Sequence, residues 1–323
     1  MTKKAVCFIV ALVIAAGCKG HKTDPERTSF TVSGTYLTVA SPDARAAQIV
    51  FNEISRLDKL FDPYSADSEL SRLNRAFNVP VKVSPEMIAL LNFSAQINFM
   101  TGGAFDATSG ALSEQWEKFT KSKDPARIPS PAEIAALKKK CGIDYIVIDK
   151  NASTAKIVKE GLKINFGGIA RGYMVDKAAE KLRTAGINNA FIDYGGNIFC
   201  MGKNHGHLWS TGIKNPRALG AILSQEEIQD EGVVTAGGPE QFFTFTGKKY
   251  SRIVDHKTGL LLNNNVISVT IITKNCLTAA GFAEPFVIMG ELGIKAFLAQ
   301  NPSTMRIFLL MDENGKPRMS IFR

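Results

Sequence analysis

The chain has 323 residues, of which 45% are hydrophobic and 21% are charged, and its formal net charge at pH 7 is +9. This apolar content excludes an intrinsically disordered chain and suffices for the core of one large domain or two closely packed ones. The positive charge favours anionic partners, but the basic residues are dispersed, without a run of five like charges. We therefore expect no nucleic-acid binding.

The N-terminal segment predicts export from the cytoplasm. Lys3 and Lys4 precede an apolar run, residues 5–16, that is too short to span a bilayer and is typical of a secretory signal peptide. Small residues lead directly into Cys18 in the pattern of a bacterial lipobox, although Ala15 stands where leucine is usual. We expect cleavage before Cys18, lipidation of this cysteine, and anchoring to a bacterial membrane on the extracytoplasmic side, facing the periplasm.

The predicted domain organisation follows from this segment. Residues 1–17 are the signal peptide, residues 18–28 a polar tether, and residues 29–323 one folded domain. The three cysteines in the domain have neither a CxxC pattern nor His-rich spacing. We expect these residues, Cys141, Cys200 and Cys276, to be small buried hydrophobes rather than zinc ligands.

Hydrophobic periodicity and cap signals predict a mixture of helices and strands after the tether. In chain order the predicted elements are a strand at 30–40, helices at 42–61 and 85–100, a helix from 131 that stops at 142, strands at 145–148, 155–158 and 162–166, a helix containing 171 and ending at 186, strands at 190–194, 197–202, 209–213, 233–238, 242–245, 250–254 and 266–272, helices at 277–289 and 292–300, and strands at 305–311 and 319–322. Because the elements lack a strict strand–helix–strand rhythm, we expect an α+β domain with a mostly antiparallel central sheet flanked by helices.

The stretch INFGGIARGYMVD, residues 164–176, is the strongest local signal. Gly167 and Gly168 join a predicted buried strand to a helix that carries Arg171 in its first turn. Glycine lets the backbone approach a ligand closely, and the free N–H groups and positive dipole end of a helix favour an anion there. A tight turn without a ligand explains the pattern equally well, and the stretch matches no standard nucleotide-binding motif.

Two further loops could belong to the same site. A second glycine pair, Gly195 and Gly196, ends a predicted strand, and such turns converge readily on one pocket. Tyr64 lies among small polar residues, where it could stack on a flat ring. A surface tyrosine in a capping loop is equally compatible with this composition.

Eight stretches, in this order along the chain, resemble the ApbE-type lipoproteins, a family of FAD:protein FMN transferases. They are GTYLTV from Gly34, DPYSADSELSRLN from Asp62, TGGAFDATSGALSEQW from Thr101, FGGIARGYMVD from Phe166, DYGGN from Asp193, VVTAGGPEQFF from Val233, YSRIVDHKTG from Tyr250 and VISVTIITKNCLTAAGFAEPFVIMG from Val266. The resemblance implies phosphoryl transfer outside the cytoplasm. FAD would bind across the turns with Mg²⁺ at its diphosphate, FMN would pass to a Thr or Ser of an acceptor redox protein subunit, and AMP would be released. FAD hydrolysis is a further activity of some members.

The resemblance also implies site residues. Tyr64 would stack on a ring of FAD, and the other cofactor-binding residues would be Thr101, Ala104, Phe105, Asp106, Gly167, Gly168, Arg171, Gly195, Gly196, Glu240 and Asp255. Arg171 and Glu284 would be catalytic. For the metal, the resemblance implies the backbone carbonyl of Ala170 as one ligand, and we expect the carboxylate of Glu284 to be the other in this chain.

The chain departs from the family pattern at the metal site. The family motif ADALAT places an aspartate and a threonine one helical turn apart, and the matching positions here are Ala280 and Glu284. Alanine offers no oxygen ligand, whereas Glu284 could project a carboxylate into nearly the same volume. Nearby changes remove acidic groups or add basic ones, at Asn165, Asn197, Arg252 and His256.

Two hypotheses remain open at this point. In the first, the protein is an active transferase with a rearranged magnesium site that uses Glu284, Asn165 and backbone carbonyls. In the second, it is a catalytically impaired, FAD-binding lipoprotein that serves as a flavin carrier or an assembly partner, with Arg171 and Arg252 compensating the phosphate charge.

Overall fold

The computed structural model describes residues 27–122, 128–214, 222–238, 242–245 and 248–323. Its centre is a sheet in which every neighbouring pair of strands is antiparallel. In order across the sheet the strands are β1 (Arg27–Val32), β2 (Thr35–Ala40), β6 (Ala190–Tyr194), β7 (Asn197–Met201), β10 (Glu231–Gly237), β15 (Val266–Thr273), β16 (Arg306–Glu313) and β17 (Lys316–Phe322). Every residue of β15 is buried, as its β-branched sequence predicts.

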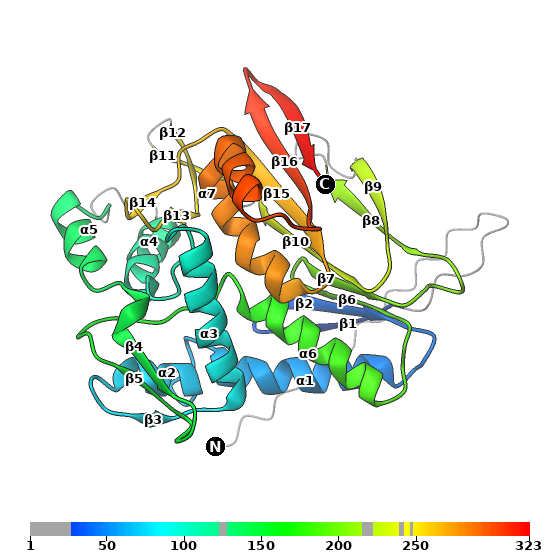
Figure 1. The fold of residues 1–323 in the computed structure, drawn as a ribbon, viewed down its shortest axis with the longest axis horizontal. Coiled ribbons are helices and arrows are strands. Elements are labelled where there is room, and N and C mark those ends of the chain that lie inside the picture. The colour runs from blue at the N-terminus through cyan, green and yellow to red at the C-terminus, as the bar shows by residue number, and fades with distance from the viewer. Residues whose placement is uncertain (1–26, 123–127, 215–221, 239–241, 246–247) are drawn as a thin grey trace.

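Helices cover one face of this sheet (Figure 1). α7 (Cys276–Gln300) packs on β10 and β15, α6 (Ala170–Thr184) packs on α7, and α1 (Ala46–Phe61) packs on α6. The two predicted C-terminal helices are the two parts of α7, because Gly290 interrupts its helical backbone with a φ of 64°. α7 is long and apolar enough to cross a membrane, but half of its most apolar window is buried within the protein.

A β-hairpin covers the opposite face of the sheet. Its strands are β8 (Trp209–Lys214) and β9 (Ile222–Ile228), and they bury Trp209, Ile213 and Ile228. These side chains pack against sheet residues that include Phe191 and Phe308. The sheet is therefore buried on both faces near its centre.

The remaining elements form a second lobe beside the helical layer (Figure 1). They are α2 (Glu69–Arg75), β3 (Val81–Lys82), α3 (Pro85–Met100), α4 (Gly110–Ser122), α5 (Pro131–Lys138), a 3₁₀ turn (Ile143–Tyr145), β4 (Ile146–Asp149), β5 (Thr154–Ile157), β11 (Phe242–Phe245), β12 (Lys248–Ser251), β13 (Val254–Asp255) and β14 (Leu260–Leu261). The Ser84 and Ser130 side chains cap α3 and α5 as their Ser-Pro signals predict, and Glu133 completes a capping box on α5.

The α+β prediction is confirmed, but several predicted bounds of individual elements are wrong. The predicted strand at 30–40 is the hairpin β1–β2, which turns at Ser33 and Gly34, both with positive φ. β1 begins at Arg27, inside the predicted tether. α1 begins at Ala46 rather than residue 42, because Ser41 is held outside the helix by a hydrogen bond from its hydroxyl to the carbonyl of Asn189 (2.7 Å).

Candidate active site

The extended segment before the first glycine pair is held by helix α2 and by the loop that precedes α4. The Asn74 side chain donates to the carbonyl of Ile164 (2.9 Å) and accepts from its N–H (2.7 Å). The N–H of Asn165 donates to the carbonyl of Ala107 (2.7 Å). Residues 162–166 are therefore not the predicted strand, although Leu162, Ile164 and Phe166 are buried in the predicted alternation.

The first glycine pair stands at the start of α6. The Asn165 carboxamide oxygen accepts the N–H of Gly167 (2.8 Å) and so fixes the turn. A Cβ on Gly168 would lie 3.4 Å from Oε2 of Glu284 and 3.5 Å from the Phe105 ring. The turn thus brings Gly168, Phe105 and Glu284 together from three distant stretches of sequence.

α6 and α7 cross closely just beyond this turn. A Cβ on Gly172 would lie 2.6 Å from the carbonyl oxygen of Cys276 and 3.0 Å from the methyl of Ala280, so only glycine fits. The Asp176 carboxylate accepts the backbone N–H groups of Cys276 and Leu277, both at 2.8 Å. This contact satisfies two N–H groups in the first turn of α7 and places a negative charge at its positive dipole end.

The second glycine pair lies beside Arg171. Gly195 and Gly196 have φ values of 59° and 83°, in the left-handed region that favours glycine. A Cβ on Gly195 would lie 3.0 Å from Nη1 of Arg171 and 2.5 Å from the Thr35 side chain. The exposed Arg171 donates a long hydrogen bond to the carbonyl of Gly195 (3.5 Å), so the two glycine turns lie side by side as the sequence predicts.

A cavity of about 180 Å³ lies next to Glu284. It is lined by Ser113, Trp116, Glu117, Thr120, Arg252, Val254, His256 and Glu284. Burial raises the pKa of the Glu284 carboxyl, and positive charge on His256 acts in the opposite direction. Within the described residues, the Glu284 carboxylate has no hydrogen bond or ion pair, and the buried Nδ1 of His256 has no hydrogen-bond partner.

Tyr64 contacts one residue of the cavity lining, Glu117. Its side chain is 76% exposed, its hydroxyl donates to the Glu117 carboxylate (3.0 Å), and the Lys121 ammonium lies 5.8 Å from the ring centre. Desolvation raises the pKa of the Tyr64 hydroxyl, and the neighbouring Glu117 raises it further. The exposed ring is compatible with both interpretations of the sequence, a stacking platform and a surface tyrosine.

The other predicted residues shape the loops around the site. Thr101 is buried and donates to the carbonyl of Ile97 (2.7 Å), and Asp106 accepts the N–H and hydroxyl of Thr108 (2.8 and 2.6 Å). Asp255 accepts the N–H of Lys257 and the hydroxyl of Thr258, both at 2.9 Å. The polar predicted residues thus hold turns in place, and Ala104 is buried. Glu240 and Cys18 lie outside the described residues.

The predicted elements do not include α4, which contributes to the cavity. This helix lines it with Ser113, Trp116 and Glu117, and the Trp116 indole donates to the carbonyl of Gly259 (2.8 Å). The signal was present in the sequence, because Leu112, Trp116 and Phe119 repeat at helical spacing and all three are buried.

The described residues hold no group of three His, Cys, Asp or Glu side chains that could bind a metal ion. Ala280 is 2% exposed and contributes only its methyl group. Glu284 is therefore the one carboxylate in the lining of the cavity that is not already paired, since Glu117 forms an ion pair with Lys121 at 2.7 Å.

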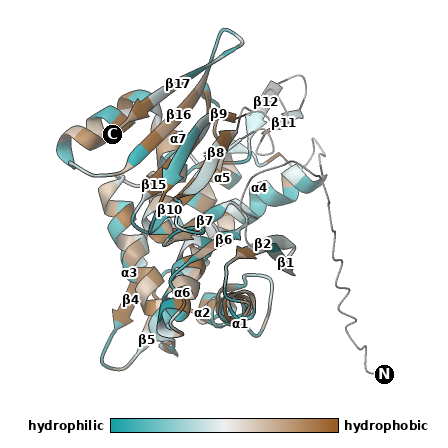
Figure 2. Cartoon of the chain, turned by 90° about the vertical axis from the view of Figure 1, so that its right-hand side faces the viewer, coloured by the Kyte–Doolittle hydropathy of each residue, from teal (hydrophilic) through white to brown (hydrophobic). Residues whose placement is uncertain are grey.

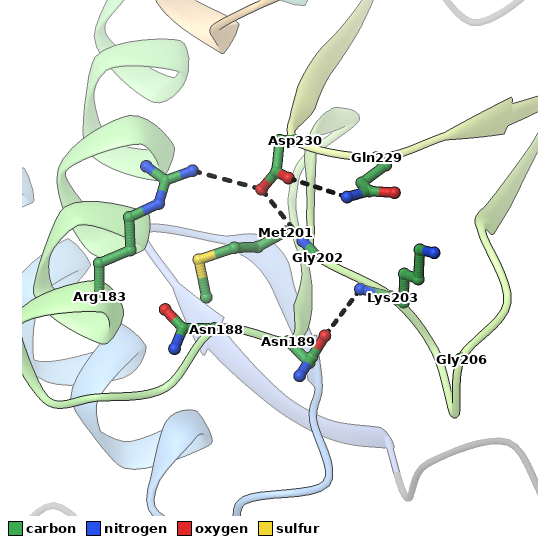
Figure 3. Close-up of a pocket in the computed structure, with 9 residues that line it drawn as sticks. All are labelled: Arg183, Asn188, Asn189, Met201, Gly202, Lys203, Gly206, Gln229 and Asp230. Atoms are coloured by element: carbon green, nitrogen blue, oxygen red, sulfur yellow. Dashed lines mark hydrogen bonds and ion pairs between the residues drawn. The ribbon is translucent and has the colours of Figure 1, made fainter.

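A second and larger cavity, of about 530 Å³, lies at the opposite end of the β6–β7 hairpin from Gly195 (Figure 3). It is lined by Arg183, Asn188, Asn189, Met201, Gly202, Lys203, Gly206, Gln229 and Asp230. Several of its polar groups bind one another: Asp230 accepts the N–H of Gly202 (3.1 Å) and Asn189 accepts that of Lys203 (2.7 Å). This cavity contains none of the predicted site residues.

Comparison with known proteins gives one consistent result. The ApbE family profile matches residues 28–309. The chain is 31% identical to an FAD:protein FMN transferase of Vibrio cholerae over 318 residues, which is 95% of this chain and 94% of the relative. It is 26% identical to one of Haemophilus influenzae over 331 residues, covering 97% and 95% of the two chains.

Solved structures agree with these sequence matches. The flavin transferase ApbE from Vibrio cholerae superposes with a TM-score of 0.80 at 28% identity, covering 92% of this chain and 96% of that one. The ApbE protein from Thermotoga maritima superposes with a TM-score of 0.79 at 26% identity, covering 91% and 96%. By profile, sequence and fold together, the chain belongs to the ApbE family.

Proposed function

We propose that this chain is an FAD:protein FMN transferase, which moves FMN from FAD to a Thr or Ser of an extracytoplasmic redox protein. The main support for the proposal is the position of the cavity. It opens beside the first glycine turn and Glu284, in a chain whose curated relatives over nearly its full length are named FAD:protein FMN transferases. Helix-start N–H groups and Arg171 suit the diphosphate of FAD, and the exposed ring of Tyr64 suits one of its flat ring systems.

The reaction exchanges the phosphoanhydride bond of FAD for a phosphoester bond to the acceptor. The acceptor hydroxyl oxygen forms a bond to the phosphorus of the FMN half, and the bond from that phosphorus to the bridging oxygen breaks. AMP leaves with the electron pair of the broken bond, and the hydroxyl proton passes to a base or to solvent. Positioning and charge stabilisation provide most of the catalysis in such transfers, and the glycine turns and Arg171 serve both.

The donor set of this chain does not fit the magnesium site that the family resemblance implies. Ala280 offers no oxygen, and the Asn165 carboxamide oxygen already accepts the N–H of Gly167. Glu284 remains, but Arg252 lines the same cavity, and its fixed positive charge opposes a divalent cation. Metal ligation by Ala170 and Glu284 stays a prediction.

The proposed activity is tested by incubating the purified chain with FAD and an acceptor redox domain. We expect AMP to appear in the supernatant and the acceptor to gain the mass of FMN on one hydroxyl. Chromatography measures the AMP, and mass spectrometry of the acceptor measures the adduct. Retention of intact FAD, with no AMP and no adduct, would contradict the proposal.

That contrary result would favour the second candidate function, a flavin carrier or assembly partner. The observation behind it is the apolar Ala280 at the position where the resemblance places a metal-binding aspartate. A carrier would hold FAD without cleaving it and pass it on unchanged to a partner protein.

We also propose that the chain is a lipoprotein facing the periplasm, on the strength of its N-terminal sequence. The support is the apolar run at residues 5–16 followed by Cys18. Metabolic labelling with a fatty-acid analogue is expected to mark the chain, whereas Cys18→Ala is expected to be unlabelled and to leave the membrane fraction. Labelling that persists in Cys18→Ala would refute lipidation at this residue.

A further inference from the structure

The charges around the candidate active site are unusual for a pocket that relies on a metal ion. Arg252 lines the cavity, and Arg171 stands at the first turn of α6. Within the described residues, neither guanidinium forms an ion pair, and the only hydrogen bond of either is that from Arg171 to the Gly195 carbonyl. Lys257 adds a third exposed cation, whose Nζ lies 3.8 Å from the Cβ position of Gly102.

The acidic groups of the same region are largely engaged elsewhere. Glu117 is paired with Lys121 at 2.7 Å and accepts from the Tyr64 hydroxyl. Asp255 and Asp106 accept hydrogen bonds within their own turns. The remaining carboxylate, that of Glu284, faces His256 in the cavity.

The residues at the positions that would supply metal ligands also argue against a metal ion. Ala280 presents a methyl group to Gly172 across the α6–α7 crossing, and Asn165 is neutral and already bonded to the turn. The diphosphate of FAD carries two negative charges that the site must compensate. A guanidinium can do so with paired, charge-assisted hydrogen bonds to phosphate oxygens, and helix-start N–H groups add partial positive charge.

We propose that this chain holds the diphosphate of FAD with Arg252 and the N-terminus of α6, and needs no divalent cation to bind it. The inference rests on the proposed function in one respect, that FAD is the ligand. It adds that the Arg252 guanidinium supplies the positive charge that a metal ion would supply in a site with an aspartate in place of Ala280. Arg171, at the second glycine turn, supports the same phosphates.

The test is equilibrium binding of FAD to the full purified chain, read from the quenching of flavin fluorescence rather than from turnover. We expect the Kd in the presence of a chelator and in millimolar magnesium to agree within about twofold, because no ion takes part. Arg252→Ala is expected to raise the Kd by about tenfold to a hundredfold, the loss typical of a hydrogen bond to a charged group. Arg252→Lys should recover part of the affinity.

Lys203→Ala is the matched control for charge. It removes one exposed positive charge at the second cavity and should leave the Kd within about twofold of the parent chain.

Glu284→Gln distinguishes a site that binds FAD without a metal ion from a site that needs one. Without a metal, removing this negative charge leaves FAD affinity unchanged or improves it, whereas a metal site would lose its carboxylate and bind FAD less tightly.

The outcomes distinguish this inference from the proposed function. A Kd that rises tenfold or more with chelator, or with Glu284→Gln, would overturn metal-free binding and leave the transferase proposal standing. An Arg252→Ala chain that binds FAD as tightly as the parent would also overturn it. If the parent chain fails to bind FAD both with chelator and with magnesium, the proposed function itself is overturned. The double variant Ala280→Asp with Glu284→Thr restores the family ligands, and we expect FAD binding to become magnesium-dependent only in that chain.

Discussion

Asn74 shows how one side chain can replace a strand. Its carboxamide pairs with both backbone groups of Ile164, as a neighbouring strand would, and therefore supports the segment before Gly167 without a ladder. Local alternation predicts the burial of Leu162, Ile164 and Phe166 correctly. The partner of the segment cannot be predicted in this way, because the two stretches lie far apart in the sequence and meet only after folding.

The residues of the candidate site also fall into two groups, those that local sequence predicts and those whose role depends on contacts made only after folding. The two glycine pairs are visible in the sequence and both lie at the candidate site, although only Gly195 and Gly196 have the positive φ that favours glycine. The isolated Glu284 carboxylate and the orphaned Nδ1 of His256 are not predictable, since each depends on which side chains line the cavity. The resemblance indicates the positions, and the structure adds their charge environment.

Two of the cysteines provide a test at this scale. Cys200 and Cys276 are fully buried, burial raises the pKa of Cys200 to about 12, and it also raises that of Cys276 well above its ordinary value. At pH 8 we expect iodoacetamide to alkylate both at least about a thousandfold more slowly in the folded chain than in denaturant, because the thiolate is the reactive form. Peptide mass spectrometry resolves each site. Labelling of either thiol at the unfolded rate would show that it is not buried.

At the scale of helices and strands, the cap signals were the most informative part of the sequence. α3 and α5 begin where Ser84 and Ser130 accept backbone hydrogen bonds. α1 begins later than its Ser-Pro signal predicts; the Ser41 hydroxyl donates to the carbonyl of Asn189 and accepts the N–H of Asp43 (3.2 Å) before the helix starts. The β1–β2 hairpin was missed since Ser33-Gly34 is a short turn between two runs of similar composition.

Alanine substitution is expected to have different effects at two glycines near the crossing of α6 and α7. Gly172→Ala would place a methyl 2.6 Å from the Cys276 carbonyl oxygen and should lower the free energy of unfolding by about 1–3 kcal/mol through overpacking. Gly168→Ala meets its neighbours only at 3.4–3.5 Å, so its stability should change by less than about 0.5 kcal/mol. It should nevertheless weaken FAD binding by occupying the space beside Glu284. Denaturant unfolding and FAD titration of both variants check the contrast, which fails if Gly168→Ala is the less stable of the two.

The start of α7 gives a second prediction at this scale. Asp176→Ala leaves the N–H groups of Cys276 and Leu277 without their acceptor, and we expect a loss of about 2–4 kcal/mol in the free energy of unfolding. Asp176→Asn keeps one acceptor oxygen and should lose less. Urea unfolding monitored by circular dichroism measures both, and equal stability of the alanine variant and the parent would exclude a capping role.

At the scale of the whole molecule, the C-terminal strand completes the sheet beyond the region that the family profile matches. β17 pairs along β16, whose residues from Ile307 to Met311 are at most 3% exposed. Figure 2 shows the hydrophilic tip of the β16–β17 hairpin extending away from the body of the protein. The tip is solvated, and the base of the hairpin belongs to the core.

Deleting residues 316–323 should therefore destabilise the entire domain. The deletion exposes one edge of β16 and removes the ion pair between Arg318 and Glu291 at the second part of α7. We expect a lower melting temperature and aggregation through the new edge. Thermal unfolding and light scattering measure these effects, and Arg323→Ala, at the exposed end of β17, is the near-neutral control. A truncated chain as soluble and stable as the parent would show that β17 is dispensable.

The pairing of β2 with β6 has a consequence for how the protein folds. Leu37 is paired with Tyr194, and all of the chain from α1 to α6 lies between these two strands. Within the part of the sheet that the structure describes, the β1–β2 hairpin pairs only with β6. It therefore cannot join the sheet until more than half of the sequence is available. Contacts of such long range make folding slow. Under the export that we propose for this chain, a sheet that closes late would keep the polypeptide unfolded while it crosses the membrane.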